Sequence, residues 1–193
     1  MSIENEIERL GGLIPVGSDA FAPPTRAYVD QLLADLGITD PPDDYIRFIT
    51  RYGSCAPAKE IQISLTNPLP EYLHARETGL SNPEHARIHL AHFYGSEQAT
   101  KTLSLQWAIR TYRDRLPKGF FPVADDGAGN QICWGPGIDG TPVFHWWDHE
   151  NEWDIDDYEE DTGEAMPPEA KYQNLYFIST SLEGMMQMME ASS

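Results

Sequence analysis

The sequence predicts an α+β fold in which helices pack against a mostly antiparallel, twisted sheet. Apolar residues recur at helical spacing over residues 25–36 and 43–52, which is typical of amphipathic helices. Short aromatic runs separated by turn residues follow one another over residues 121–149, which is typical of a β-meander. With 193 residues, of which 40% are hydrophobic, the chain suits a single domain over residues 1–193 with its core at about 25–189.

The two helices expected near the N-terminus have recognisable ends. A glycine follows residues 25–36 as a candidate C-cap, because glycine readily adopts the left-handed backbone that ends a helix. Residues 43–52 come after two prolines and carry Asp43 and Asp44 in the first turn, where carboxylates stabilise the positive end of the helix dipole. We therefore expect two separate helices joined by a proline-containing turn.

The remaining elements follow from local patterns. Residues 59–65 alternate apolar and polar side chains, which predicts a half-buried strand. Prolines interrupt residues 68–92 and favour a long connection with short helices. A helix is expected over residues 103–114, and the apolar spacing over residues 174–189 predicts a C-terminal helix that packs onto the sheet.

The charge of the chain restricts its partners. It has 13 Lys and Arg residues against 31 Asp and Glu residues, which gives a formal net charge of −18. Residues 119–193 contain 16 of the acidic residues and a single base, Lys171. Such a field repels phosphate backbones and anionic lipid surfaces, so we expect neither a nucleic-acid nor a membrane partner. Basic proteins are the partners that it favours.

The N-terminal sequence and the cysteines indicate a cytoplasmic protein. The first nine residues alternate acidic and apolar side chains and lack the basic start and apolar run of a signal peptide. No stretch approaches the ~18 consecutive apolar residues that a membrane helix requires. Cys55 and Cys133 are too few for a disulfide framework and lack metal-ligand spacing, so we expect buried free thiols.

Two groups of histidines make a metal-dependent hydrolase the alternative from another functional class. One group is His145, Asp148 and His149, but on a strand the two imidazoles would lie roughly 13 Å apart, too far to bind one ion directly. The other group has helical spacing and comprises His85, His89 and His92. No acidic residue of the HExxH type lies between them, and we expect a solvated helix face. No carboxylate pair or nucleophile motif stands out, so we expect no catalytic residue, metal or cofactor.

The segment Asp126-Gly127-Ala128-Gly129-Asn130 predicts a tight hairpin turn. Its glycines permit positive φ, and its Asp and Asn side chains can accept hydrogen bonds from nearby backbone donors. A phosphate-binding loop is disfavoured, because the segment is negatively charged and lacks a Gly-Lys-Ser/Thr ending.

Three blocks in this order resemble the SUKH superfamily. Residues 42–53 read PDDYIRFITRYG, residues 116–133 read LPKGFFPVADDGAGNQIC, and residues 143–150 read VFHWWDHE. The expected C-terminal helix has a counterpart in SUKH domains, so the resemblance covers most of the chain. It implies a SUKH-like α+β fold for the whole chain.

The resemblance also implies a function. SUKH proteins are non-enzymatic binding modules, and many bacterial members are immunity proteins that neutralise polymorphic toxins delivered between competing cells. By this resemblance the partner is a cognate toxin domain encoded next door, with a basic nuclease the best match to the net charge of −18. A regulatory scaffold, as in fungal cell-wall regulators of the family, is the other alternative. The oligomeric state is left open.

The acidic segment over about residues 148–170 is the expected partner-binding region. Nine carboxylates lie within residues 148–161, and we expect a solvated loop there. Trp and Tyr within a negative surface suit recognition of a basic protein, although a solvated loop with its aromatic residues folded inward is an equal alternative. Nearby arginines, Arg110, Arg113 and Arg115, are expected to pair with these acids. The candidate contact residues are Asp125, Asp126, Trp147, Asp148, Glu150, Glu152, Trp153, Asp154, Asp156, Asp157 and Tyr158.

Overall fold

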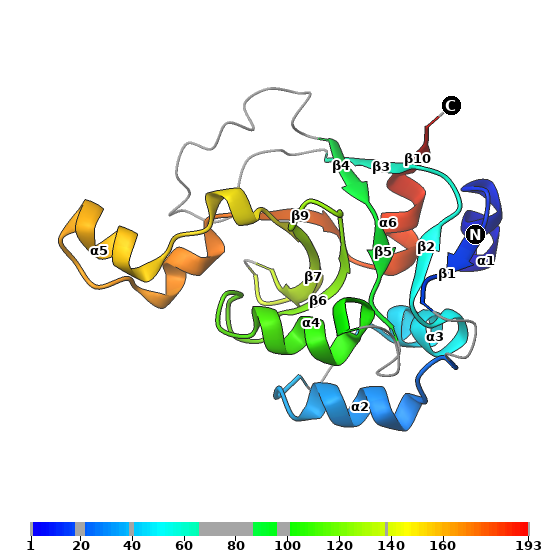
Figure 1. Ribbon diagram of the computed structural model, residues 1–193, viewed down its shortest axis with the longest axis horizontal. Coiled ribbons are helices and arrows are strands. Elements are labelled where there is room, and N and C mark those ends of the chain that lie inside the picture. Colours follow the sequence, from blue (N-terminus) through cyan, green and yellow to red (C-terminus); the bar gives the residue numbers. More distant parts are fainter. Residues whose placement is uncertain are drawn as a thin grey trace.

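The computed structural model describes residues 2–17, 22–38, 41–65, 87–95, 101–137 and 139–192. A seven-stranded sheet has the order β1-β2-β5-β6-β7-β8-β9, and a three-stranded sheet has the order β10-β3-β4 (Figure 1). All pairings between these strands are antiparallel. The predicted α+β class with a mostly antiparallel sheet is therefore confirmed.

The strands of the larger sheet are β1 (Leu13–Pro15), β2 (Cys55–Pro57), β5 (His92–Phe93), β6 (Phe121–Asp125), β7 (Gln131–Pro136), β8 (Pro142–Trp147) and β9 (Leu175–Ser179). Those of the smaller sheet are β3 (Ile61–Ser64), β4 (Arg87–Leu90) and β10 (Met189–Ala191). The α-helices are α1 (Ile3–Arg9), α2 (Arg26–Ala34), α3 (Asp43–Tyr52), α4 (Leu105–Tyr112), α5 (Ile155–Thr162) and α6 (Leu182–Met188). Three short 3-10 helices are η3 (Lys101–Leu103), η4 (His149–Asn151) and η5 (Pro168–Tyr172).

One continuous core joins the helices to both sheets. It contains buried side chains of α2, α3, α4 and α6 together with those of β3, β4 and the central strands. Every residue of β6 is buried, as are all but one of β7 and of β8. The meander is therefore covered on both faces, which removes the polar-and-apolar alternation of a half-solvated sheet.

Several predicted elements are confirmed. Helices α2, α3 and α4 lie within the predicted ranges, β3 lies within residues 59–65, and β6 to β8 form the meander. Asp43 and Asp44 occupy the first turn of α3, and Gly53 ends that helix with a φ of 66°. The two cysteines are free and buried, as predicted.

Two predictions of helix are wrong. Residues 174–189 do not form one helix, because the chain runs first as strand β9 beside β8 and then as α6, which begins after the N-cap Ser181. Residues 87–93 form strands β4 and β5 instead of part of a helical connection. In β4 the side chains alternate between exposed and buried, a period-two pattern that disfavours a helix. The remainder of the predicted connection, residues 68–86, lies outside the described residues.

The acidic segment is also more ordered than predicted. Residues 149–162 contain η4 and helix α5 where a loop was expected, although α5 buries none of its residues, as expected for a solvated segment. Asp154 caps α5 by accepting a hydrogen bond from the Asp156 backbone, and Gly163 ends it in the left-handed conformation. These two ends and the acidic first turn suit a helix despite its lack of an apolar face.

None of the helices in the described part of the chain combines the length and the apolar character that crossing a bilayer requires.

Candidate protein-interaction site

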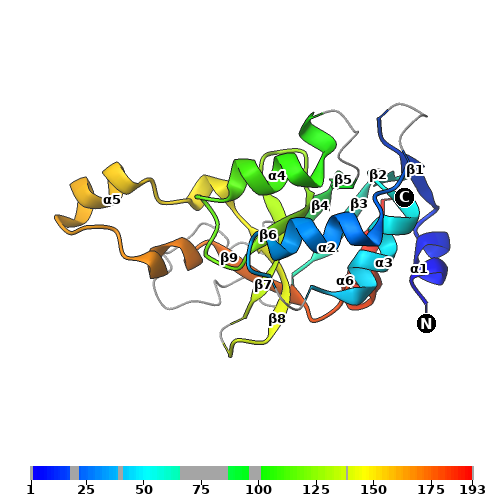
Figure 2. The same ribbon diagram turned by 90° about the horizontal axis from the view of Figure 1, so that it is seen from below.

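An acidic arm, which we define as residues 149–172, connects β8 to β9 and projects from the body of the protein. In both ribbon views its helix α5 lies at the end of the molecule opposite α1 and β1 (Figures 1 and 2). The arm carries ten carboxylates and one lysine, Lys171. Within it only Ala170 is buried. The arm is therefore a strongly negative surface held outside the core.

The root of the arm is fixed by hydrogen bonds around the buried Asp148. The Asp148 carboxylate accepts bonds from the Glu150 backbone N–H at 3.1 Å and the Asn151 side-chain amide at 2.6 Å. Its backbone oxygen accepts a bond from the Asn174 side-chain amide at 2.6 Å. Burial raises the pKa of Asp148 above its ordinary value, while the hydrogen bonds that its carboxylate accepts from Asn151 and Glu150 act in the opposite direction. Asp148 thus closes the strand pair and starts the arm.

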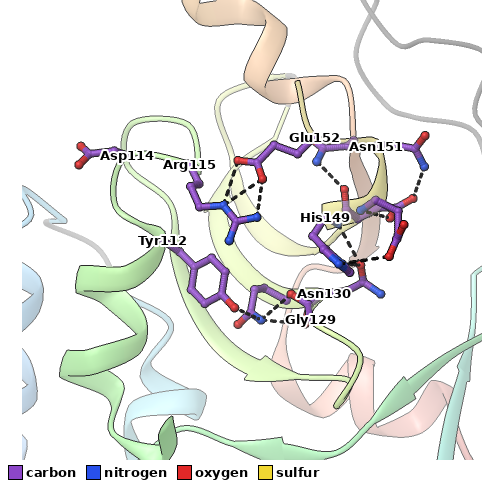
Figure 3. A network of polar contacts seen from close by, with 12 residues as sticks. Tyr112, Asp114, Arg115, Gly129, Asn130, His149, Asn151 and Glu152 are labelled. Carbon is purple, nitrogen blue, oxygen red and sulfur yellow. Dashed lines mark hydrogen bonds and ion pairs between the residues drawn. The ribbon is translucent and has the colours of Figure 1, made fainter. Parts of the chain in front are cut away.

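Arg115 links the body to the arm (Figure 3). Its guanidinium donates to both oxygens of the Glu152 carboxylate, with Nε to Oε2 at 2.9 Å and Nε to Oε1 at 3.1 Å, and its terminal nitrogen also contacts Oε2. The same guanidinium lies over the Trp147 ring at 4.8 Å and over the Tyr112 ring at 5.3 Å. Its hydrogen bonds with Glu152 raise the pKa of Arg115. The predicted ion pairing with the acidic half is confirmed for this arginine.

A second tie comes from the same turn. The Lys171 ammonium, at the end of the arm, donates to the backbone oxygen of Asp114. Asp114 precedes Arg115 in the chain. The turn after α4 therefore holds both the segment before α5, through Glu152, and the segment after α5, through Lys171. Within the arm, the rings of Trp153 and Tyr158 make an edge contact with centroids 5.1 Å apart. These contacts order the arm without burying α5.

The hairpin between β6 and β7 supports the other side of the root. The Asn130 side-chain oxygen accepts a bond from the His149 backbone at 2.9 Å and lies 2.8 Å from its ring Nδ1 (Figure 3). Asp126 accepts bonds from the Ala128 and Asn130 backbones, which confirms the tight turn. Gly129 has a φ of 109°, and a Cβ there would lie 3.0 Å from the His149 ring. Only glycine therefore allows the turn and the arm to approach so closely.

Behind this hairpin lies a buried polar network. The Tyr94 hydroxyl is 2.8 Å from the Gln131 side-chain oxygen and 3.1 Å from the Asp125 carboxylate. Gln131 in turn donates to the Tyr112 hydroxyl at 2.9 Å. Burial, followed by the charge of Asp125, raises the pKa of Tyr94. The network fixes α4 against the meander and so positions the turn that holds the arm.

Three of the predicted contact residues do not lie on the surface. Trp147 is 0% exposed and packs in a small cluster with Tyr112 and Leu175, so its prediction as an exposed anchor is wrong. Asp125 is 9% exposed and Asp148 is 5% exposed, and both carboxylates serve the internal hydrogen bonds described above. Asp125 and Trp147 are the last residues of β6 and β8, and Asp148 follows β8, so all three lie at the ends of strands that are buried on both faces.

The remaining predicted residues reach solvent. Asp126 is half-buried in the hairpin turn, and the others come together on the arm: Glu150, Glu152, Trp153, Asp154, Asp156, Asp157 and Tyr158. The prediction missed Glu159, Glu160 and Ile155, which are exposed on the same helix. Reading the acidic run as a helix between Asp154 and Gly163 would have included them.

The described histidines of the two groups lie on different elements. His145 is fully buried in β8. His89 lies on β4 and His92 on β5, so the expected solvated helix face is wrong for these two, and His85 lies outside the described residues. Across the described ranges, no group of three His, Cys, Asp or Glu side chains is arranged to hold a metal ion.

Comparison with known proteins supports the three sequence blocks. The SUKH family model described as SMI1-KNR4 cell-wall matches residues 41–164. The SPbeta prophage-derived uncharacterized protein YokK of Bacillus subtilis (strain 168) is 33% identical over 115 residues, which cover 56% of this chain and 54% of that protein. The chain thus spans about half the length of this curated relative. No solved structure matches the chain. The family match extends over more than half of the sequence and includes the meander and most of the arm, and the chain belongs to the SUKH family.

Proposed function

We propose that this protein is an immunity protein, which neutralises a toxin domain by forming a stoichiometric complex with it. Family membership supports the proposal, because SUKH proteins are generally immunity proteins. The protein would act in the cytoplasm of the cell that makes both proteins, as a binding partner and without a catalytic step of its own.

The acidic arm is the observation that carries the proposal. Helix α5 has five carboxylates, no base and no buried residue. A helix of this kind is poorly stable by itself, because like charges repel and no apolar face packs. The chain nevertheless holds it in place through Arg115, Lys171 and the bonds of Asp148. An ordered negative projection suits recognition of a basic protein surface, where it raises the association rate and excludes acidic competitors.

A nuclease toxin is the partner that this surface fits best. Enzymes that bind nucleic acid present basic surfaces to the phosphate backbone. An arm with ten carboxylates could occupy such a surface, so that toxin and nucleic acid could not bind together. If the arm inhibits the toxin by covering its nucleic-acid-binding surface, one inhibitor molecule binds one toxin molecule. Nucleic acid should then compete with the inhibitor for the toxin.

Co-expression tests this function directly. The protein is produced together with the product of the gene immediately upstream, the candidate toxin, and survival of the host is compared with that of cells that express this product alone. Titration calorimetry of the purified proteins then measures the complex. We expect rescue, a 1:1 complex with sub-micromolar Kd, and weaker binding at high salt. Absence of both rescue and binding heat with this toxin contradicts the proposal.

A further inference from the structure

A cleft of about 560 Å³ lies between the acidic arm and the body of the protein. Its arm side includes Ile155 and Met166, and its body side includes Leu116 and Phe120 from the connection after α4. Tyr172 lines it where the arm returns to the sheet. The Lys171 tie to the Asp114 backbone, at residues that also line the cleft, fixes its two walls relative to each other.

Ile155 leaves apolar surface uncovered at this cleft. It is 57% exposed, and among the described residues only Ile14, at 52%, is a comparably exposed large hydrophobic side chain. Ile155 also lines a second hollow of about 460 Å³, which includes Trp153 and Arg115. A large exposed apolar side chain that lines two hollows is a common feature of surfaces that bind another protein.

The charges around the cleft indicate which partner would cover it. The walls hold three basic and three acidic side chains, so the cleft itself is close to neutral: Arg113, Lys118, Lys171, Asp35, Asp114 and Glu159. By contrast, α5 beside it has only acidic charged residues. A neutral, partly apolar recess next to a negative helix is complementary to an apolar side chain flanked by Lys or Arg.

We propose that the cleft beneath the acidic arm receives an apolar side chain of a basic polypeptide, with Ile155 as its principal contact. This inference rests on the proposed function, in which the polypeptide belongs to the toxin. The apolar anchor supplies the contact that is excluded from water, and the carboxylates of α5 hold the basic residues on either side of it.

A peptide titration tests the cleft without the toxin. The ¹⁵N-labelled protein is titrated at low salt with three synthetic peptides, acetyl-KKLKK-amide, acetyl-KKAKK-amide and acetyl-EELEE-amide. We expect acetyl-KKLKK-amide to shift the amide signals of the cleft walls and to bind at least about threefold more tightly than the alanine peptide. The glutamate peptide should not bind. Equal affinities of the two lysine peptides, with shifts confined to α5, would overturn the inference.

A matched pair of variants tests the same contact in the full complex. Ile155→Ser and Ile14→Ser each remove one exposed isoleucine. Ile155 belongs to α5 and Ile14 to β1, and these two elements lie at opposite ends of the molecule (Figure 1). We expect Ile155→Ser to weaken toxin binding about tenfold and Ile14→Ser to leave it unchanged, with both variants folded. Toxin binding that Ile155→Ser does not alter overturns the cleft and leaves the proposed function intact. Peptide binding in the cleft without any toxin binding would support the cleft as a binding site and contradict the proposed function.

Discussion

The guanidinium of Arg115 donates to both oxygens of the Glu152 carboxylate while it lies over the buried ring of Trp147. A carboxylate at the start of the acidic arm is thereby attached to a platform that belongs to the core. Glu152 precedes the N-cap of α5 by two residues, so this contact holds the chain in place just before the helix begins. The arrangement explains how a helix that buries nothing still has a defined place.

Arg115→Ala should release the arm. The variant loses the two-oxygen contact and the ring packing, and we expect amide hydrogen exchange of residues 152–162 to increase several-fold with a loss of about 1 kcal/mol in unfolding free energy. Arg115→Lys should recover the effect only in part, because an ammonium cannot make the forked contact. Arg26→Ala, which removes an exposed arginine paired with Asp30 and Asp43, is the control. Unchanged exchange in the arm of Arg115→Ala would contradict this role.

Asp44→Ala should destabilise the fold from a distance. The Asp44 carboxylate accepts bonds from the backbones of Leu182 at 2.6 Å and Glu183 at 3.4 Å, which are the first two residues of α6. Removing it leaves donors at a helix N-terminus unsatisfied, and we expect a loss of about 1–2 kcal/mol in urea unfolding. The neighbouring Asp43 is exposed and pairs with the surface arginines Arg26 and Arg47, so Asp43→Ala should change stability little. Similar effects of the two variants would show that the α6 contact does not stabilise the protein.

The cysteine thiols should be unreactive in the native protein. Burial raises the pKa of Cys55 to about 12 and that of Cys133 well above its ordinary value, so the reactive thiolate is scarce at neutral pH. We expect Ellman's reagent to label neither cysteine at about pH 8 and both after denaturation. Fast labelling of the native protein is the result that this account does not allow.

The buried Asp148 should give the stability a specific pH dependence. Burial raises the pKa of Asp148 in the folded state, so the folded protein binds this proton more tightly than the unfolded chain. Ionisation of this carboxyl lowers the free energy of unfolding. The loss is absent at pH values below the pKa of the group in the unfolded chain and is complete above its pKa in the folded protein. Relative to the wild type, Asp148→Asn should therefore gain in stability as the pH rises from about 3 to about 7. Urea unfolding at each pH measures this difference, and a constant difference would rule out the effect.

The sequence was informative where local chemistry determines structure. Asp43 and Asp44 precede an apolar helical face, and the turn at residues 126–130 contains its own glycines and capping side chains. Strand β9 was missed because both of its faces are largely buried, so its apolar run has no period that distinguishes a strand from a helix. Helix α5 was missed because it has no apolar face.

The candidate site was predictable in composition but not in geometry. The acidic and aromatic run at residues 149–162 indicated the arm, and most of its predicted contact residues reach solvent. Trp147 was assigned to the surface because the sequence cannot show that a strand is covered on both faces. The pair of Arg115 and Glu152 joins residues 37 positions apart, and no local pattern connects them.

In the proposed function the acidic arm, rather than the overall negative charge, binds the toxin. This role of the arm is tested by calorimetry of the toxin domain against two variants in which five exposed carboxylates are changed to amides. The arm variant changes Asp156, Asp157, Glu159, Glu160 and Asp161. The control variant changes Glu4, Glu8, Glu60, Asp139 and Glu190, so that both have the same net charge. We expect the arm variant to lose at least about 100-fold in affinity and the control to lose less than about fivefold. Equal losses in the two variants would contradict this role.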